Sequence, residues 1–270
     1  MNPSMLTLRL AAAEHIARCA GAMLLERERK RDFSIAEKQE NDYVTEADVL
    51  CERMIAEYLS CLFPGDGFHG EESGDSGSAG PRWIVDPIDG TMNFMRGIPN
   101  YTISIAWETE PGDPLLGVVY LVRQEEMFSG CQGMGATCNG IPINVSSIED
   151  PGNALLVCET PHRRKQWADR YWELFSSLFM QCSDIRTFGS IALELCYIAC
   201  GRLDAVFEYS LGYWDIAAGA AILQAAGGRI EPIDRNRRLG DEPCDFIASN
   251  GLLHDWIAPQ VREFGTIRNG

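Results

Sequence analysis

The sequence predicts a mixed α/β protein whose first half is of the α+β type and whose second half alternates strands with helices. Apolar residues recur at helical steps of three and four near the N-terminus. Paired apolar runs follow in the first half, spaced as the two arms of a hairpin would be. Beyond about residue 151, strand-like and helix-like patterns alternate. We therefore expect two lobes, residues 1–150 and 151–270, with a soft boundary between residues 145 and 155.

Two helices are expected at the start of the chain. The first covers residues 5–31 and is followed by a polar loop at residues 34–44. The second begins after Thr45, which is a suitable N-cap, and ends at Pro64-Gly65. Its apolar face carries Cys51, Met54, Ile55, Tyr58, Leu59 and Leu62.

Strands fill the rest of the predicted first half. An acidic, glycine-rich loop at residues 70–81 precedes a short apolar run that begins at Trp83. The later strands are expected at residues 101–107, 116–122 and 126–129, before a glycine-punctuated segment at 130–143.

In the second half we expect strands at residues 154–157, 203–208 and 246–249. The predicted helices are 167–180, 190–200, 214–226 and a terminal one.

Charge and composition exclude several classes of partner. The chain has 270 residues, 46% hydrophobic and 23% charged, as is ordinary for a globular protein. Its formal net charge of −16 argues against binding nucleic acid or an anionic membrane through bulk charge, so we expect neither as a partner. The same charge disfavours phosphate substrates unless bound cations reverse the field locally.

Cysteine use predicts the compartment. The ten cysteines form no CxxC pair, and several occupy apolar positions of predicted helices. We expect reduced thiols and a cytoplasmic protein. No stretch approaches the ~18 apolar residues of a membrane span, and no secretory signal is readable.

The segment Trp83 to Phe94, WIVDPIDGTMNF, is the most informative part of the chain. Its apolar start predicts a buried strand, yet Asp86 and Asp89 follow within a few residues, on a stiffened turn where Pro87 and Gly90 stop any regular continuation. A carboxylate directly after such a run must either face water at the sheet edge or find a cation.

Other acidic residues could converge on this segment. Asp48 and Asp215 lie at predicted helix starts, where an acid also complements the helix dipole. Glu71 and Glu72 lie in a loop that could simply be solvated. A site made only of carboxylates, without nearby His or Cys, favours a hard ion such as Mg²⁺, and several acids could hold more than one.

Such a site has a defined chemistry. Clustered Mg²⁺ ions can bridge phosphate oxygens, activate a water and stabilise a leaving alkoxide. Gly90 and Thr91 would offer backbone N–H groups to the phosphate, and the Thr91 hydroxyl could orient the attacking water. His69 lies close to the acidic loop, but we do not expect it to be a ligand.

Taken together, these strings make the chain similar to the inositol monophosphatase family of Mg²⁺-dependent, lithium-sensitive phosphatases. The resemblance covers about residues 5–265 and is most specific in two strings, DPIDGTMNF and WDIAAG, the latter at Trp214 to Gly219. Further matching strings are Val44 to Asp48, Gly70 to Ser73, Gly133 to Gly140, and Ala226 to Gly228. The resemblance implies a layered αβαβα sandwich of the sugar-phosphatase type and a homodimer.

The resemblance also implies a set of metal ligands. By that analogy Glu71, Asp86 and the Ile88 carbonyl hold a first Mg²⁺, and Asp86, Asp89 and Asp215 hold a second. Glu71 would also help to hold a weaker third ion, near a mobile loop that carries Lys38.

The remaining implied roles concern the reaction and the substrate. Thr91, paired with Asp48, would activate the nucleophilic water, with Glu71 counted among the catalytic residues. The residues implied to bind phosphate or substrate are Asp89, Gly90, Thr91, Gly189, Ser190 and Glu208.

The expected activity is Mg²⁺-dependent hydrolysis of a small polyol or sugar phosphate, foremost myo-inositol monophosphate. Histidinol phosphate, fructose 1,6-bisphosphate and adenosine 3′,5′-bisphosphate remain alternative substrates, because pocket contacts rather than the metal core decide specificity. A regulatory or scaffolding protein that keeps the fold is the alternative from another class.

Overall fold

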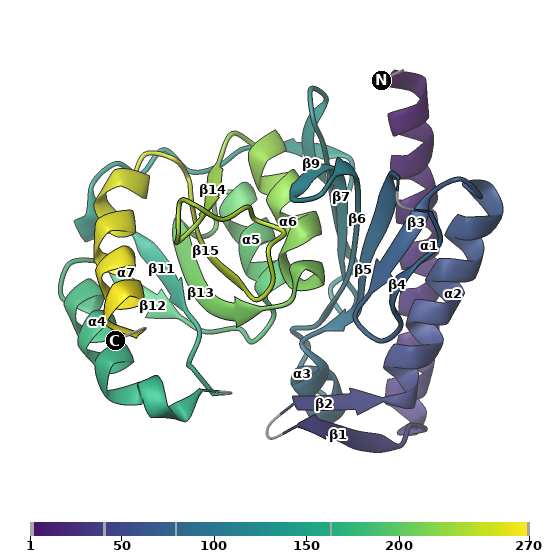
Figure 1. Cartoon of the computed structure of the whole chain (residues 1–270), viewed down its shortest axis with the longest axis horizontal. Coiled ribbons are helices and arrows are strands. Elements are labelled where there is room, and N and C mark those ends of the chain that lie inside the picture. The colour runs from purple at the N-terminus through teal and green to yellow at the C-terminus, as the bar shows by residue number, and fades with distance from the viewer. Residues whose placement is uncertain (1–2, 40–41, 79, 163, 269–270) are drawn as a thin grey trace.

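Helices and sheets alternate in five layers, as the computed structural model shows for residues 3–39, 42–78, 80–162 and 164–268 (Figure 1). Three apolar cores hold these layers together. One lies on the outer face of each sheet, and the third surrounds the middle helices between the two sheets. The predicted fold class, a layered αβαβα sandwich, is confirmed.

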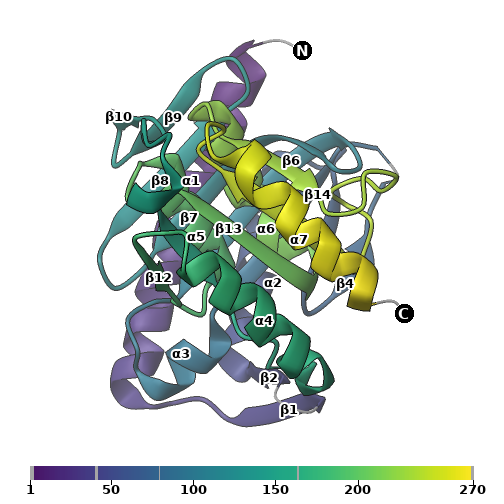
Figure 2. The same cartoon turned by 90° about the vertical axis from the view of Figure 1, so that its left-hand side faces the viewer.

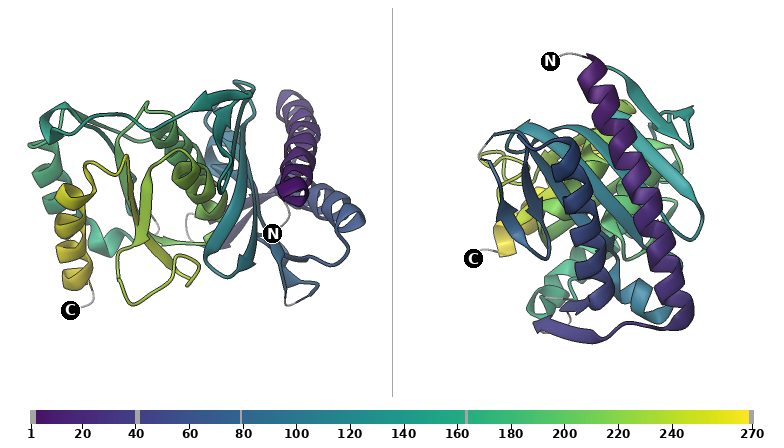
Figure 3. Two further views of the ribbon diagram at one scale, coloured as in Figure 1. Left: turned by 90° about the horizontal axis from the view of Figure 1, so that it is seen from above. Right: turned by 90° about the vertical axis from the view of Figure 1, so that its right-hand side faces the viewer.

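The first outer layer consists of α1 (Pro3–Lys30) and α2 (Glu46–Leu62), which lie side by side on one face of the larger sheet (Figure 3). Thr45 caps α2, as predicted, because its hydroxyl accepts the N–H of Ala47. Apolar side chains of both helices, including Leu24 and Ile55, are buried against the sheet.

The larger sheet has eight strands among the described residues, in the order β10-β9-β8-β7-β6-β5-β3-β4. All neighbours are antiparallel except β3 and β5, which are parallel. The strands are β3 (Gly67–Gly70), β4 (Gly74–Ser76), β5 (Arg82–Asp89), β6 (Thr102–Glu110), β7 (Asp113–Leu121), β8 (Glu126–Cys131), β9 (Gly135–Cys138) and β10 (Ile141–Ile143).

The middle layer consists of α5 (Ile191–Ala199) and α6 (Tyr213–Ala225), which pack between the two sheets. These helices belong to the second half of the chain, yet α6 packs directly on β6 and β7 of the first half. The start of α6 is thereby brought to the sheet that carries the Asp-Pro segment. The division of the chain into lobes at about residue 150 stays a prediction.

The smaller sheet has the order β12-β11-β13-β15-β14, and α4 (Ala168–Phe179) and α7 (His254–Arg268) cover its outer face (Figure 2). Its strands are β11 (Leu155–Cys158), β12 (Asp184–Arg186), β13 (Ala205–Leu211), β14 (Arg229–Pro232) and β15 (Cys244–Ser249). Short 3-10 turns cover Pro151–Asn153 and Lys165–Trp167. No described helix has the length and apolar content needed to cross a membrane.

The predicted loop at residues 34–44 was wrong. Its described residues form an antiparallel ribbon of β1 (Ile35–Gln39) and β2 (Asp42–Thr45), which lies beside the short helix α3 (Thr91–Arg96). Strand periodicity is not readable here because Ile35, Ala36 and Glu37 of β1 are all exposed, so β1 lacks the alternation of buried and exposed side chains that marks a half-buried strand. Strands β3, β4, β12 and β14 were also missed, because they are only three or four residues long.

Candidate metal centre

Three carboxylates from distant parts of the chain converge at one point. Asp86 and Asp89 lie on β5, and Asp215 lies in the first turn of α6. Each offers a ligand oxygen, and these oxygens all lie within 4.8 Å of one another. The first half of the chain thus supplies two acids and the second half supplies one.

A bulge in β5 brings Asp86 and Asp89 to the same side of the sheet. Residues three apart in a regular strand point to opposite faces. The pairing of β5 with β6 shifts register between Asp86 and Asp89, at the position of Pro87. The N–H of Ile88 then donates to Asp86 Oδ1 at 2.9 Å, which fixes that carboxylate inside the bulge.

Asp89 is tied to the start of α5. Its Oδ2 accepts hydrogen bonds from the Ser190 hydroxyl at 2.6 Å and from the Ala192 N–H at 2.8 Å. Because both bonds end on Oδ2, neither occupies Oδ1. Ser190 therefore lies next to the acids. Its hydroxyl holds the Asp89 carboxylate, in addition to lining the cavity.

Glu71 joins the group through the turn that follows β3. Its backbone N–H donates to Val85 O at 3.1 Å, and its side chain lines the same cavity as the three aspartates. The buried carboxylate of Glu52 on α2 holds this turn by accepting the N–H groups of Glu72 at 2.8 Å and Ser73 at 2.9 Å. A Cβ at Gly70 would lie 2.4 Å from Glu52 Oε2, so this packing requires glycine.

Sequence reasoning missed Glu52. A signal existed, because Glu52, Ile55 and Leu59 lie at helical spacing on the buried side of α2, where a lone acid needs a partner. The partner proved to be backbone about twenty residues away, which no local pattern reveals.

Burial, together with the nearby acids, raises the pKa values of this group. Burial, reinforced by the negative charge of Glu71 and then of Asp89 and Asp215, raises the pKa of Asp86 well above its usual range. Burial also raises the pKa of Asp89 to about 6, although hydrogen bonds from Ser190 and Ala192 oppose the rise. Buried carboxylates of this kind need a cation to ionise together, and an all-oxygen donor set fits Mg²⁺.

Asp48 and Thr91 form a second polar group beside the acids. Asp48 is fully buried, and its Oδ2 accepts the backbone N–H of Thr45 at 2.8 Å and the Thr45 hydroxyl at 2.6 Å. The Thr91 hydroxyl faces two acceptors, Asp48 Oδ1 at 3.3 Å and Ile88 O at 3.1 Å. The single proton of Thr91 therefore points toward these acceptors, and its lone pairs remain available to a donor such as water.

Gly90 begins α3 in a conformation that favours glycine. Its φ is +93°, and a Cβ there would lie 3.0 Å from both Asn100 O and Gly189 O. The Asn93 amide donates to Asn100 O, just before β6, at 2.7 Å and ties α3 to the loop before α5 by donating to Phe188 O at 2.8 Å. Gly189 and the Asp-Pro segment are thereby brought together.

A cavity of about 310 Å³ opens next to these groups. Among the residues named by the sequence, its walls include Glu71, Asp86, Ile88, Asp89, Gly90, Thr91, Gly189, Ser190, Glu208 and Asp215. Asp48 lies behind this wall and reaches it through Thr91. Lys38 falls in β1, and its side chain lies outside the described part of the structure.

Glu159 also lines the cavity, although sequence reasoning did not single it out. Its Oε1 accepts the N–H groups of Phe188 and Gly189, each at 2.9 Å. Glu194 on α5 accepts the same Phe188 N–H, and burial, with the nearby charge of Glu159, raises its pKa well above the usual range. Glu159 thus lines the cavity, and both acids hold the backbone at Phe188, next to Gly189 of the cavity wall.

Comparison with known proteins points to one family and one fold. The sequence model described as the inositol monophosphatase family matches residues 5–266. The Nus factor SuhB of Xylella fastidiosa is 36% identical over 240 residues, which are 87% of each chain. The fructose-1,6-bisphosphatase/inositol-1-monophosphatase of Aquifex aeolicus is 33% identical over 92% of this chain and 94% of its own. The crystal structure of the suppressor protein suhB of Bartonella henselae superimposes with a TM-score of 0.89 at 30% identity, over 95% of this chain and 99% of its own.

Proposed function

The chain belongs to the inositol monophosphatase family, and from that premise we propose that it is a Mg²⁺-dependent phosphomonoesterase acting on a small polyol or sugar phosphate. The observation that carries the proposal is the convergence of Asp86, Asp89 and Asp215, whose oxygens lie within 4.8 Å of one another. Such a group is costly for a metal-free protein, because its members repel one another and are largely buried.

We assign the metal ligands as the family resemblance implies. Glu71, Asp86 and the Ile88 carbonyl would hold one Mg²⁺, while Asp86, Asp89 and Asp215 would hold a second. A weaker third ion is proposed beside Glu71, toward the ribbon that carries Lys38. When bound, Mg²⁺ supplies the positive charge that draws in phosphate oxygens and water, against the net charge of −16.

Thr91 and Asp48 are proposed to position the attacking water. Because the Thr91 proton is directed at Asp48 Oδ1 or Ile88 O, the Thr91 oxygen can accept a hydrogen bond from water. Asp48 is itself held by the N–H and hydroxyl of Thr45, so the pair is rigid before substrate arrives. The backbone N–H groups of Gly90 and Thr91 are proposed to bind the phosphate.

The side of the cavity away from Asp86 is proposed to bind the alcohol part of the substrate. Glu208 would accept a hydrogen bond from a substrate hydroxyl, and Gly189 and Ser190 line the same cavity. A cavity of about 310 Å³ suits a single small ring, which favours myo-inositol monophosphate. Histidinol phosphate, adenosine 3′,5′-bisphosphate and fructose 1,6-bisphosphate remain the alternatives, and the last appears in the name of the Aquifex aeolicus relative.

The test is phosphate release from this panel of substrates under a Mg²⁺ titration, with a lithium arm. We expect inositol 1-phosphate to be hydrolysed fastest and lithium to inhibit. Asp89→Asn should lower the rate by at least ~10³, because the loss of one metal ligand removes several kcal/mol of transition-state stabilisation. Equal activity in this variant would defeat the assignment.

A regulatory role is the second candidate, because several relatives carry the name Nus factor. A cytoplasmic homodimer is proposed in either case. A partner captured by the tagged chain equally well with Mg²⁺ and with a chelator would favour this role. If capture requires Mg²⁺, or if no partner is captured, the result would favour the enzyme alone.

A further inference from the structure

Asp215 is the one acid of the converging three that comes from the second half of the chain, so something must hold its helix against the repulsion of Asp86 and Asp89. Inside the first turn of α6, Asp215 Oδ2 accepts the N–H of Gly212 at 2.8 Å, which fixes the carboxylate to its own helix. That bond does not tie α6 to the first half.

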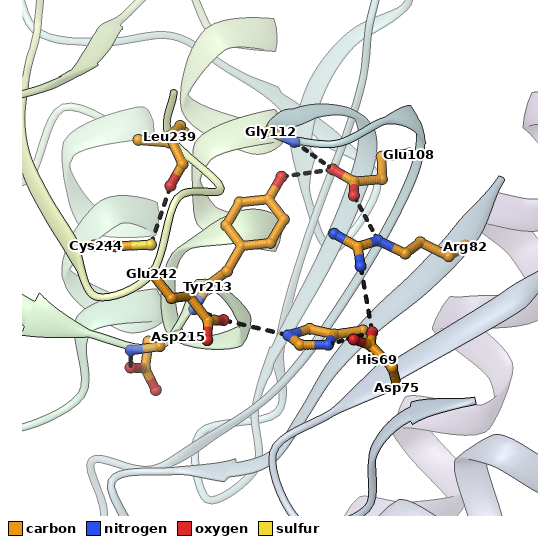
Figure 4. A network of polar contacts seen from close by, with 11 residues as sticks. His69, Asp75, Arg82, Glu108, Gly112, Tyr213, Asp215, Leu239, Glu242 and Cys244 are labelled. Atoms are coloured by element: carbon orange, nitrogen blue, oxygen red, sulfur yellow. Dashed lines mark hydrogen bonds and ion pairs between the residues drawn. The ribbon is translucent and has the colours of Figure 1, made fainter. Parts of the chain in front are cut away.

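Glu242 provides a second hold on the same helix start. It lies in the segment between β14 and β15, and its Oε1 accepts the N–H of Tyr213, the first residue of α6, at 2.9 Å. The same oxygen lies 3.3 Å from Nε2 of His69 on β3 (Figure 4). The ring of His69 also packs against the indole of Trp214, with 5.3 Å between centroids. His69 precedes Glu71 by two residues.

The contacts continue into a closed circuit that crosses both halves (Figure 4). His69 Nδ1 lies 2.8 Å from Asp75 Oδ1, which Arg82 also contacts at 3.3 Å. Arg82 donates through Nε to the buried Glu108 at 2.8 Å. Glu108 accepts the Tyr213 hydroxyl at 2.8 Å, which returns the circuit to the start of α6.

We propose that the contact between His69 and Glu242 positions Asp215 against Glu71, so that ligands from the two halves form one cage. This proposal rests on the proposed function, because it concerns the same Mg²⁺ ions. His69 and Glu242 are positioning residues, since both nitrogens of His69 face carboxylates from Asp75 and Glu242 and neither is directed at the cage.

The arrangement favours positioning over bulk stability. The His69 side chain is 12% exposed and the Glu242 side chain 37% exposed, so water still screens the pair and its contribution to folding is small, on the order of 1 kcal/mol. Its partner on α6 is a backbone N–H that α6 itself leaves unsatisfied, because the first turn of a helix has no internal acceptor. The contact therefore sets where α6 begins relative to β3, and the distance between Glu71 and Asp215 follows from it.

The test measures Mg²⁺ binding to the full chain by calorimetry in His69→Gln, Glu242→Gln and the double variant. Each single variant should weaken Mg²⁺ affinity by about tenfold, the effect typical of losing a group that orients a metal ligand. The double variant should lose little more, because either change already removes one partner, the imidazole or the carboxylate, of the same contact. The thermal midpoint should hardly move, and kcat should recover at saturating Mg²⁺.

Glu126→Gln is the matched control. Glu126 on β8 pairs with Arg202, which follows α5, at 2.7 and 2.5 Å, so this ion pair also joins the two halves, but it ties β8 to the end of α5 rather than to the start of α6. It should leave Mg²⁺ affinity unchanged. The proposal is overturned if folded His69→Gln and Glu242→Gln bind Mg²⁺ as the wild type does, or if Glu126→Gln weakens binding equally. A wild-type chain that binds no Mg²⁺ would instead contradict the proposed function.

Discussion

Glu52 Oε2 accepts the backbone N–H of Glu72 at 2.8 Å, and this bond from a buried carboxylate fixes the turn that carries Glu71. A buried side chain of helix α2 thus holds the turn that carries a proposed metal ligand. The carboxylate uses its other oxygen for Ser73, so both of its oxygens are occupied by backbone donors.

Glu52→Gln should damage both stability and metal binding. The amide would set an N–H₂ group against one of the two backbone donors, leaving a buried group unsatisfied. We expect a loss of about 1–3 kcal/mol in the free energy of unfolding, measured by urea denaturation in a chelator. Mg²⁺ affinity should fall by about tenfold or more because Glu71 loses its support. Glu57→Gln, on the exposed side of α2, is the control and should change neither quantity.

Gly90→Ala should abolish activity. It should also lower the free energy of unfolding by more than the strain of a positive φ alone would. The residue has φ +93°, and its Cβ would lie 3.0 Å from two carbonyl oxygens. Gly133→Ala separates the two effects, because Gly133 has φ +76° but no atom within 4 Å of its Cβ. We expect Gly133→Ala to lower the free energy of unfolding by about 1–2 kcal/mol and to keep its activity. Similar rates of phosphate release in both variants would contradict this account.

Thr91→Ala should lower kcat without changing Mg²⁺ affinity. The substitution removes the hydroxyl that faces Asp48 and Ile88, and a positioned group of this kind contributes about 10²–10⁴-fold to rate. Thr91→Ser keeps the hydroxyl and should retain most of the activity. Steady-state kinetics at saturating Mg²⁺ would show this contrast, and an active Thr91→Ala variant would remove Thr91 from the mechanism.

Mg²⁺ should stabilise the protein more at pH 7.5 than at pH 5. Burial raises the pKa of Asp89 from 3.8 to about 6 in the metal-free fold, and burial also raises the pKa of Asp86 well above its usual range. A raised carboxyl pKa means that the folded state binds more protons than the unfolded state. The contribution of Asp89 to stability is therefore present at low pH and lost as the pH rises toward about 6. Mg²⁺ requires the ionised form and reverses this loss above that pH.

Differential scanning fluorimetry with Mg²⁺ or a chelator, at both pH values, measures the effect. The shift in thermal midpoint caused by Mg²⁺ should shrink at pH 5, and Asp89→Asn should weaken the dependence on pH. A shift of the same size at pH 5 and pH 7.5 would show that these carboxyls do not bind the ion.

Local patterns predicted the parts of the fold that have local causes. The periodicity of α1 and the capping of α2 by Thr45 could be read from the sequence, because the relevant residues are neighbours in the chain. The β1–β2 ribbon could not, because successive residues of β1 are exposed and leave no alternation of buried and exposed side chains. The bulge at Pro87 was visible only as a proline and a glycine around two acids.

The residues of the candidate site also fall into predicted and unpredicted groups. The resemblance named Asp215 together with Asp86 and Asp89, and the fold places their oxygens together. Glu52, Glu159 and the pair of His69 with Glu242 were not predicted as parts of the site. Each acts on residues far away in the sequence, often through backbone N–H groups, and such bonds leave no spacing or residue-type signal.

Anomalous diffraction from crystals soaked in Mn²⁺, a heavier ion that oxygen sites for Mg²⁺ accept, tests the central claim most directly. The account predicts anomalous peaks within bonding distance of oxygens from both Asp86 and Asp215, with at least one peak also bonded to Glu71. Strong peaks confined to other parts of the molecule, with the oxygens of Asp86, Asp89 and Asp215 left without an ion, would contradict it.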